Sequence, residues 1–263
     1  MARSIGVCDF LEPPDTLSWE LRPPDIQQCL RTRTREVDQS ILTGVADDGK
    51  KRLLIVRHAE SSANSKGILA GRIDPTPLTN RGKSEAKAIR EVVAHFSPQI
   101  TISSPMLRCR ETAKAAGIGS FEIDDRLLEM DYGRWSGKSL KTLSRTPLWR
   151  RIQQKPSSVT FPGGESFIGA QERIRNFLIE ITNRPVERVA IFSHGDIVRM
   201  AINILLGRRD DEFQRIMIET ASHSLLSFSL NPLTSEFETT LHYLNRRESL
   251  RLDKRIGFKV GGE

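Results

Sequence analysis

Residues 52–57 read Arg-Leu-Leu-Ile-Val-Arg, and His58 follows them directly. A short apolar run that includes β-branched side chains is typical of a strand buried on both faces in a parallel sheet. The pattern returns at 188–193, where Arg-Val-Ala-Ile-Phe-Ser precedes His194 and Gly195. Parallel strands present their carboxyl ends at one edge of a sheet, where ligands bind. We therefore expect both histidines at that edge.

Helix and strand signals alternate between these two stretches. Thr79 is a good N-cap for a helix that Pro98 ends, because the apolar residues between them recur three or four positions apart. A strand is expected over 99–103. Ser104 and Pro105 then predict the cap and the first position of the next helix.

The remainder of the chain continues this alternation. Helices are expected over 165–181 and 197–205, and 224–230 and 237–244 are typical of a closing pair of strands. Strands that alternate with amphipathic helices indicate an α/β fold. We predict a three-layer sandwich with a mostly parallel central sheet flanked by helices.

Composition divides the chain into three parts. Residues 1–50 contain two related stretches, Leu-Glu-Pro-Pro-Asp at 11–15 and Leu-Arg-Pro-Pro-Asp at 21–25, whose proline pairs favour an extended backbone. We expect an N-terminal extension here that is extended or partly disordered. Residues 51–245 form the expected folded domain, and 246–263 form a basic C-terminal tail.

Several protein classes are excluded by composition. The 263 residues are 38% hydrophobic, and no apolar run approaches the roughly 18 to 20 residues that cross a membrane. The first residues lack the apolar core of a secretory signal. Cys8, Cys29 and Cys109 are too few and too scattered for a disulfide framework or a zinc site. We expect a cytoplasmic protein with reduced cysteines and no membrane contact.

The net charge of +7 is unevenly distributed. Residues 1–50 are net acidic, with six Lys or Arg and nine Asp or Glu, whereas residues 51–263 carry a charge of +10. A basic domain favours an anionic partner. Nucleic acid is not expected, because aromatic residues are few, zinc-finger spacing is absent and no run of five basic residues occurs.

Two arginines accompany the two histidines. Arg57 is the last residue of the first strand, beside His58. Arg108 falls in the first turn of the helix after 99–103, so that a helix N-terminus delivers it to the edge that also carries His194. Two arginines and two histidines around one point indicate a tetrahedral oxyanion, because guanidinium groups bind phosphate oxygens in pairs.

These residues belong to four motifs that occur in a fixed order over about residues 52–230. The motifs are Arg57-His58-Ala59-Glu60-Ser61 with Asn64, Ser104-Pro105-Met106-Leu107-Arg108 with Thr112-Ala113, Leu128-Glu129 with Gly133 and Gly137, and Ser193-His194-Gly195. In this combination the chain resembles the histidine phosphatase, or phosphoglycerate mutase-like, superfamily. The resemblance implies that residues 51–245 are a catalytic domain, and a homodimer is compatible with it.

The resemblance also implies a role for each residue. His58 would attack phosphorus and form a phosphohistidine. Glu129 would protonate the leaving oxygen and then activate the water that cleaves the intermediate. The phosphoryl oxygens would be held by Arg57, Arg108, His194 and Asn64. The family needs no metal or cofactor, and the chain has neither a His-Glu-x-x-His motif nor an EF-hand loop.

Two competing enzyme classes lack their motifs. The residues Gly82-Lys83-Ser84 resemble the end of a nucleotide-binding loop, but Pro77 occupies the position where that loop requires a glycine. The chain contains no Gly-x-Ser-x-Gly, so a serine hydrolase is not expected either.

Substrate choice should depend on residues 65–77 and 136–161. Gly71 and Arg72 are assigned to substrate binding. The sequence leaves open whether a group of further arginines and tryptophans contacts substrate or packs at the surface; its members are Arg134, Arg150, Arg151, Trp135 and Trp149.

The branch of the superfamily is indicated by two stretches. Met130 and Asp131 follow Glu129, where the glycolytic mutases of the superfamily usually place two basic residues that help hold the substrate's carboxylate. Residues 161–166, Phe-Pro-Gly-Gly-Glu-Ser, resemble a stretch of the broad-specificity and ribazole-phosphate phosphatases. We predict a metal-independent phosphomonoester hydrolase acting on a small phosphorylated metabolite. The alternatives are a phosphoglycerate mutase, a protein phosphatase directed by residues 1–50, and a scaffold with a vestigial site.

Overall fold

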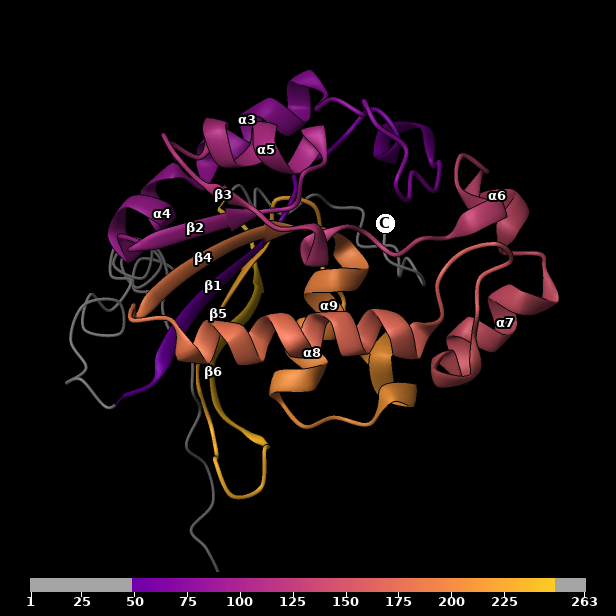
Figure 1. Cartoon of the computed structure of the whole chain (residues 1–263). Coiled ribbons are helices and arrows are strands. Elements are labelled where there is room, and N and C mark those ends of the chain that lie inside the picture. Colours follow the sequence, from indigo (N-terminus) through magenta and orange to yellow (C-terminus); the bar gives the residue numbers. More distant parts are fainter. Residues whose placement is uncertain (1–48, 249–263) are drawn as a thin grey trace, which may run out of the picture. The chain divides into compact units, whose positions relative to one another are not determined.

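The computed structural model describes residues 49–248 (Figure 1). The expectations for the N-terminal extension, including both proline-pair stretches, lie outside the described residues. The same holds for residues 249–263, which make up most of the basic tail.

One six-stranded sheet has the strand order β3-β2-β4-β1-β5-β6. Its strands are β1 (Lys51–Arg57), β2 (Ile100–Ser103), β3 (Glu122–Ile123), β4 (Arg188–Ser193), β5 (His223–Leu230) and β6 (Phe237–Arg246). The strands β1 to β4 pair in parallel, whereas β5 runs antiparallel to both β1 and β6. The prediction of a mostly parallel sheet is confirmed.

Helices cover both faces of this sheet. They are α3 (Asn80–Ala88), α4 (Arg90–Phe96), α5 (Leu107–Ala115), α6 (Leu140–Leu143), α7 (Pro147–Gln154), α8 (Phe167–Asn183) and α9 (Gly195–Leu205). Figure 1 shows α3, α4 and α5 on one face and α8 and α9 on the other. The predicted three-layer α/β sandwich is therefore confirmed. No helix within residues 49–248 is long and apolar enough to cross a membrane.

Short 3-10 helices connect several of these elements. They span Asn64–Lys66, Asp125–Leu127, Gly133–Trp135, Pro156–Ser158 and Asp210–Arg215.

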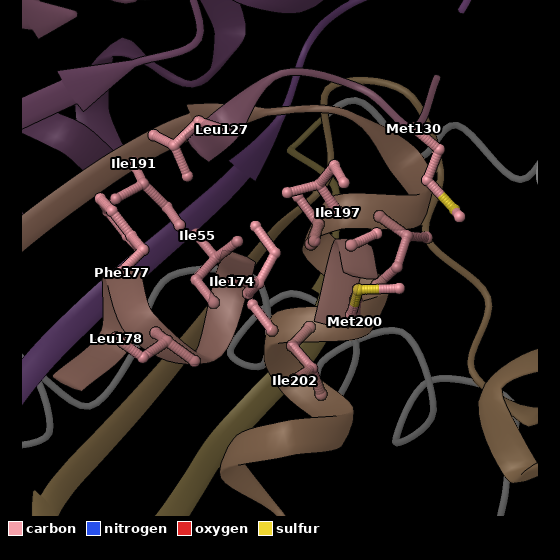
Figure 2. Close-up of a cluster of buried hydrophobic side chains, with 14 of the residues drawn as sticks. Ile55, Leu127, Met130, Ile174, Phe177, Leu178, Ile191, Ile197, Met200 and Ile202 are labelled. Atoms are coloured by element: carbon pink, nitrogen blue, oxygen red, sulfur yellow. The ribbon is translucent and has the colours of Figure 1, made fainter. Parts of the chain in front are cut away.

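The core lies between the sheet and the pair α8 and α9. Ile55 of β1 and Ile191 of β4 face Ile174 and Phe177 of α8, as Figure 2 shows, and all four side chains are at most 1% exposed. Each such side chain contributes about 1.5 to 3 kcal/mol by leaving water. Because β1 and β4 are fixed in this core, the residues at their carboxyl ends have little freedom to move.

The helix predicted to begin at Thr79 is divided into two. The Thr79 side chain accepts a hydrogen bond from Gly82 N at 2.9 Å, as expected of an N-cap. At Ile89 the backbone N–H bonds to Ala86 O, three residues back, which is a tighter turn than an α-helix makes. The elements α3 and α4 meet at this residue.

The predicted start of α5 is wrong. Its first residue is Leu107 and not Pro105, and its N-cap is Met106, which makes no side-chain capping bond. Ser104 lies two residues before that cap, and its buried hydroxyl accepts a hydrogen bond from Met106 N at 3.4 Å and also lies 2.8 Å from Nε2 of His194. The Ser104 hydroxyl therefore makes a local turn contact and a contact with a distant part of the chain, and the helix begins two residues later than predicted.

Candidate active site

The two strand-end histidines meet at the carboxyl edge of the sheet. His58 follows β1 and His194 follows β4, and these two strands are hydrogen-bonded neighbours. The ring centroids are 5.3 Å apart with the planes inclined by 67°. The predicted convergence of these residues is therefore present.

The hydrogen bonds of His58 determine which ring nitrogen is free. Its Nδ1 lies 2.8 Å from the carbonyl oxygen of Ala59. A carbonyl oxygen only accepts, so Nδ1 carries the ring proton and Nε2 keeps a lone pair. Burial, together with the charges of Arg108 and Arg57, holds the pKa of His58 well below its ordinary value. The imidazole is thus neutral near pH 7, with the free lone pair on Nε2 that a nucleophile requires.

Two buried guanidinium groups surround this imidazole. Arg57 is 3% exposed and donates from Nη1 to Ile218 O at 2.6 Å, while its buried Nε has no acceptor among the described residues. Arg108 is 1% exposed and donates from Nη2 to Gly71 O at 2.8 Å. Neither forms an ion pair with a described carboxylate. Buried cations that form no direct ion pair favour an anionic ligand in this site.

Glu129 supplies a carboxyl group to the same site. Its side chain is largely buried, and Oε1 accepts a hydrogen bond from Met130 N at 3.0 Å. Burial and the nearby carboxylate of Asp196 raise its pKa to about 7. A carboxyl group with this pKa is partly protonated at neutral pH, so it can donate and later accept a proton.

His194 is fully enclosed. Its exposed fraction is 0%, and besides Ser104 it contacts Sγ of Cys109, which lies 3.5 Å from Nε2. Burial and the charge of Arg108 lower its pKa well below the ordinary value. The Ser104 hydroxyl and the Cys109 thiol both lie close to Nε2 of His194, and these contacts hold the imidazole ring in one orientation beside His58.

Asn64 and Gly71 both line the cavity that His58 lines, and their contact with substrate stays a prediction. The Asn64 Oδ1 accepts hydrogen bonds from the backbone N–H and the hydroxyl of Ser61, at 3.0 and 2.8 Å. This leaves the Nδ2 amide group as the donor for a ligand. Gly71 contributes its backbone, whose carbonyl oxygen anchors Arg108.

The cavity has a volume of about 90 Å³, room for several water molecules and hence for a phosphate with a small substituent. Its lining includes most of the predicted site residues and residues of the two segments expected to decide substrate choice, 65–77 and 136–161. The lining residues are Arg57, His58, Ser61, Asn64, Ile68, Leu69, Ala70, Gly71, Arg108, Glu129, Tyr132, Leu140, Gln153, Gly195, Asp196, Arg199 and Gln214.

Arg72 does not line this cavity. Its Nε donates to Glu129 O at 2.9 Å, and Nη2 donates to Glu165 Oε2 at 3.3 Å. Its visible effect is to hold the backbone of Glu129, and direct contact with substrate stays a prediction. The other arginines and tryptophans left open by the sequence also lie outside the cavity lining; they are Arg134, Arg150, Arg151, Trp135 and Trp149. Trp135 stacks on Trp149 with ring centroids 6.3 Å apart.

Glu165, which the sequence predicts only as the start of a helix, supports the site through hydrogen bonds. Its Oε1 accepts hydrogen bonds from Asp131 N at 2.8 Å and from Arg173 Nη2 at 2.9 Å. The preceding Gly164 is packed so closely that an added Cβ would lie 2.1 Å from Asp131 O. Residues 161–166 therefore support the segment that carries Glu129.

Five polar residues of the cavity lining carry no signal in the sequence that predicts them. Asp196 and Arg199 belong to α9, two and five positions after His194, where only the apolar positions were considered. The Tyr132 hydroxyl donates to Asp196 Oδ2 at 2.7 Å. Gln153 and Gln214 carry no motif that could have identified them. Within residues 49–248, no group of three His, Cys, Asp or Glu side chains is placed to hold a metal ion.

Comparison with known proteins agrees with this geometry. The profile of the Histidine phosphatase superfamily (branch 1) matches residues 53–236. Phosphoserine phosphatase 1 of Hydrogenobacter thermophilus is 33% identical over 181 residues, which cover 66% of this chain and 85% of that protein. A 2,3-bisphosphoglycerate-dependent phosphoglycerate mutase of Rhizobium etli is 31% identical over 169 residues, covering 56% and 76%.

A solved structure shares the fold. The native structure of a mycobacterial glucosyl-3-phosphoglycerate phosphatase matches with a TM-score of 0.66 at 24% identity. The match covers 74% of this chain and 99% of that chain.

Proposed function

Because the chain belongs to the histidine phosphatase superfamily, we propose that it hydrolyses monoesters of small phosphorylated metabolites through a phosphohistidine formed on His58. The family match and the relative named a phosphatase support the enzyme class, a phosphoric monoester hydrolase. The cytoplasmic location expected from the scattered cysteines belongs to the same proposal.

The first step transfers the phosphoryl group. The lone pair on Nε2 of His58 attacks phosphorus, and the bond from phosphorus to the leaving oxygen breaks. Glu129 gives its proton to that oxygen, so an alcohol departs. Arg57 and Arg108 hold the phosphoryl oxygens, whose charge is stabilised by donors already in place.

The second step regenerates the enzyme. The Glu129 carboxylate takes a proton from water while the water oxygen attacks phosphorus. The bond from phosphorus to Nε2 of His58 breaks, inorganic phosphate leaves, and Glu129 is protonated again. One carboxyl group serves both steps because its pKa of about 7 allows both protonation states near neutral pH.

The observation that carries this proposal is the hydrogen bond from His58 Nδ1 to Ala59 O. It leaves the lone pair on Nε2, at a cavity that His58 lines together with Arg57 and Arg108. A structural histidine would need neither a cavity nor two buried cations without carboxylate partners. The small cavity favours a metabolite over a folded phosphoprotein.

A phosphoglycerate mutase is the second candidate, which the relative from Rhizobium etli favours. Against it, Met130 is 2% exposed and packs in the hydrophobic cluster of Figure 2. Asp131 lies near Arg72, with Oδ2 4.0 Å from Nη1. Neither residue after Glu129 therefore offers a cation to a substrate carboxylate.

The test measures phosphate release from p-nitrophenyl phosphate and a panel of phosphorylated metabolites, with and without EDTA. We expect turnover that EDTA leaves unchanged and that His58→Ala abolishes, while the exposed His95→Ala retains wild-type rates. Rapid quench with ³²P-labelled substrate should trap protein-bound phosphate that is labile to acid, as a phosphohistidine is. Turnover retained in His58→Ala would refute the mechanism, and interconversion of phosphoglycerates without net hydrolysis would identify a mutase.

A further inference from the structure

The end of β6 contacts two parts of the chain that hold His58 in place. Asn245 is the next-to-last residue of this strand, and Arg247 follows the strand directly. Neither side chain lines the cavity, and both residues lie beyond 53–236, the range that the superfamily profile matches. Two series of contacts nevertheless lead from them to the residues beside the cavity.

The segment 218–222, which precedes β5, holds one side of the site. The carbonyl oxygen of its first residue accepts from Arg57 Nη1 at 2.6 Å. The backbone N–H of Arg57 donates to Ser222 O at 3.0 Å, and Ala221 N donates to His58 O at 3.2 Å. This segment therefore fixes the guanidinium group proposed to bind the phosphate and also the backbone of His58.

Asn245 holds this segment through its side chain. Its Oδ1 accepts a hydrogen bond from Glu219 N at 2.8 Å, and Glu219 is the second residue of the segment 218–222. The backbone N–H of Asn245 donates to Ser224 Oγ at 2.9 Å. The φ of Asn245 is +53°, in the left-handed region, where asparagine, aspartate and glycine are the residues most easily accommodated.

Arg247 reaches the other side of His58 through Glu85 of α3. Its Nη2 donates to Glu85 Oε1 at 2.9 Å. The Glu85 side chain is 6% exposed, and its Oε2 accepts from Glu60 N at 3.1 Å, two residues after His58. Arg81 also donates to Glu85 Oε1, at 3.1 Å. A buried carboxylate needs such charged partners, so Arg247 helps to keep Glu85 in its position.

Arg247 also links the two sides of the site. Its Nη1 lies 3.7 Å from Glu219 Oε2, so one guanidinium group bridges α3 and the segment 218–222. The Arg247 side chain is 15% exposed, and salt screens a pair in such a position less than an exposed pair. A displacement of about 1 Å can lower an enzymatic rate about 100-fold, so small movements of these contacts would affect the reaction.

We propose that Asn245 and Arg247 are positioning residues for phosphoryl transfer, which keep the parts of the chain on both sides of His58 in the geometry that the reaction needs. The proposal rests on the proposed function, because this geometry matters for activity only if His58 attacks phosphorus. Since neither side chain lines the cavity, their loss should lower kcat more than it raises KM.

The test measures kcat and KM for p-nitrophenyl phosphate at a temperature where every variant is folded. Asn245→Gly allows the left-handed backbone but removes the acceptor, whereas Asn245→Asp keeps both. We expect kcat to fall roughly 10- to 100-fold in Asn245→Gly and to stay near the wild-type value in Asn245→Asp. Arg247→Met, which keeps the length of the side chain without its charge, should lower kcat in the same range.

Two matched controls remove similar contacts elsewhere and should keep kcat. Asn231→Gly acts at the turn between β5 and β6, where Asn231 Oδ1 accepts from Leu233 N at 2.9 Å. Arg184→Met removes another arginine that bridges two carboxylates, those of Glu122 and Glu180.

The readouts separate positioning from folding. Side chains that only stabilise the fold would lower the unfolding temperature and leave kcat of the folded protein unchanged, and this result would overturn the proposal. In Arg57→Gln, adding Asn245→Gly should lower kcat far less than it does in the wild type, because part of the contact acts through Arg57. An equal loss in both backgrounds also overturns the proposal. If Asn245→Gly does not fold, Arg247→Met and its control decide.

Failure of the proposed function gives a different result. If the wild type hydrolyses no ester, amide hydrogen exchange followed by mass spectrometry tests the contacts alone. Residues 57–61 and 218–222 should exchange several-fold faster in Asn245→Gly than in Asn245→Asp, while β2 exchanges equally in both. That result keeps the end of β6 as the anchor of these segments, and equal exchange throughout overturns it.

Discussion

Replacing Glu129 by glutamine should make the protein more stable at alkaline pH while it removes the proton donor. Burial and Asp196 raise the pKa of Glu129 from the ordinary 4.5 to about 7. A difference of this size corresponds to a free energy on the order of 3 kcal/mol. Glutamine has nearly the same shape, and its amide oxygen can still accept the hydrogen bond from Met130 N.

The sign of the effect follows from proton binding. Between about pH 4.5 and 7 the folded state holds a proton on Glu129 that the unfolded state has lost. The free energy of unfolding of the wild type therefore falls as the pH rises through this window. Below it both states are protonated and Glu129 is neutral. Above it the folded protein carries a buried carboxylate, which Glu129→Gln does not have.

Urea unfolding of both proteins, followed by tryptophan fluorescence from pH 4.5 to 8.5, measures this difference. Glu129→Gln should match the wild type at the acid end and exceed it by up to roughly 3 kcal/mol above pH 7. The control Glu172→Gln, on the exposed face of α8, should follow the wild type throughout. A constant difference between Glu129→Gln and the wild type at every pH would refute the argument.

Three further substitutions test individual contacts. Gly82→Ala should lower the free energy of unfolding by about 3 kcal/mol or more, because the new Cβ would lie 2.0 Å from Glu60 O and clash with the backbone. Thermal unfolding measures the loss. Thr112→Val should lower the free energy of unfolding by about 1 to 3 kcal/mol and reduce kcat, because the Thr112 hydroxyl accepts a hydrogen bond from Ala59 N at 3.0 Å, next to His58. A rescue of both by Thr112→Ser would confirm the role of the hydroxyl. Glu165→Gln should lower kcat more than it raises KM, because it loosens the segment that carries Glu129, the proposed general acid. An unchanged kcat would contradict this role.

The residues that could be predicted are those placed by a strand. His58 and His194 follow β1 and β4 directly, and the carboxyl ends of parallel strands share one edge, so a one-dimensional pattern was sufficient. Arg108 is placed almost as directly, in the first turn of α5. For such residues the distance along the chain to a buried strand sets the position in space.

The residues that escaped prediction depend on contacts between distant segments. Ser104 has the local signature of a helix cap, yet its hydroxyl faces His194, ninety positions away along the chain. Arg199 is on a helix whose apolar face predicts packing, and only the assembled cavity shows that its Nε lacks an acceptor. A single sequence does not distinguish such side chains from ordinary helix residues.

The hydrogen-bond acceptors that hold the buried arginines and His58 explain how the site keeps its positive charge. Arg57 and Arg108 are held by the carbonyl oxygens of Ile218 and Gly71, and His58 is held by that of its neighbour. A carbonyl oxygen orients a donor without cancelling its charge, whereas a carboxylate would compete with the phosphate for the same guanidinium. Arg199 is the cavity arginine that pairs with a described carboxylate. The cavity is therefore positive beside His58, where the proposed phosphoryl transfer would take place, and closer to neutral beside Arg199 and Asp196. This difference would allow one end to bind a dianion without attracting a second.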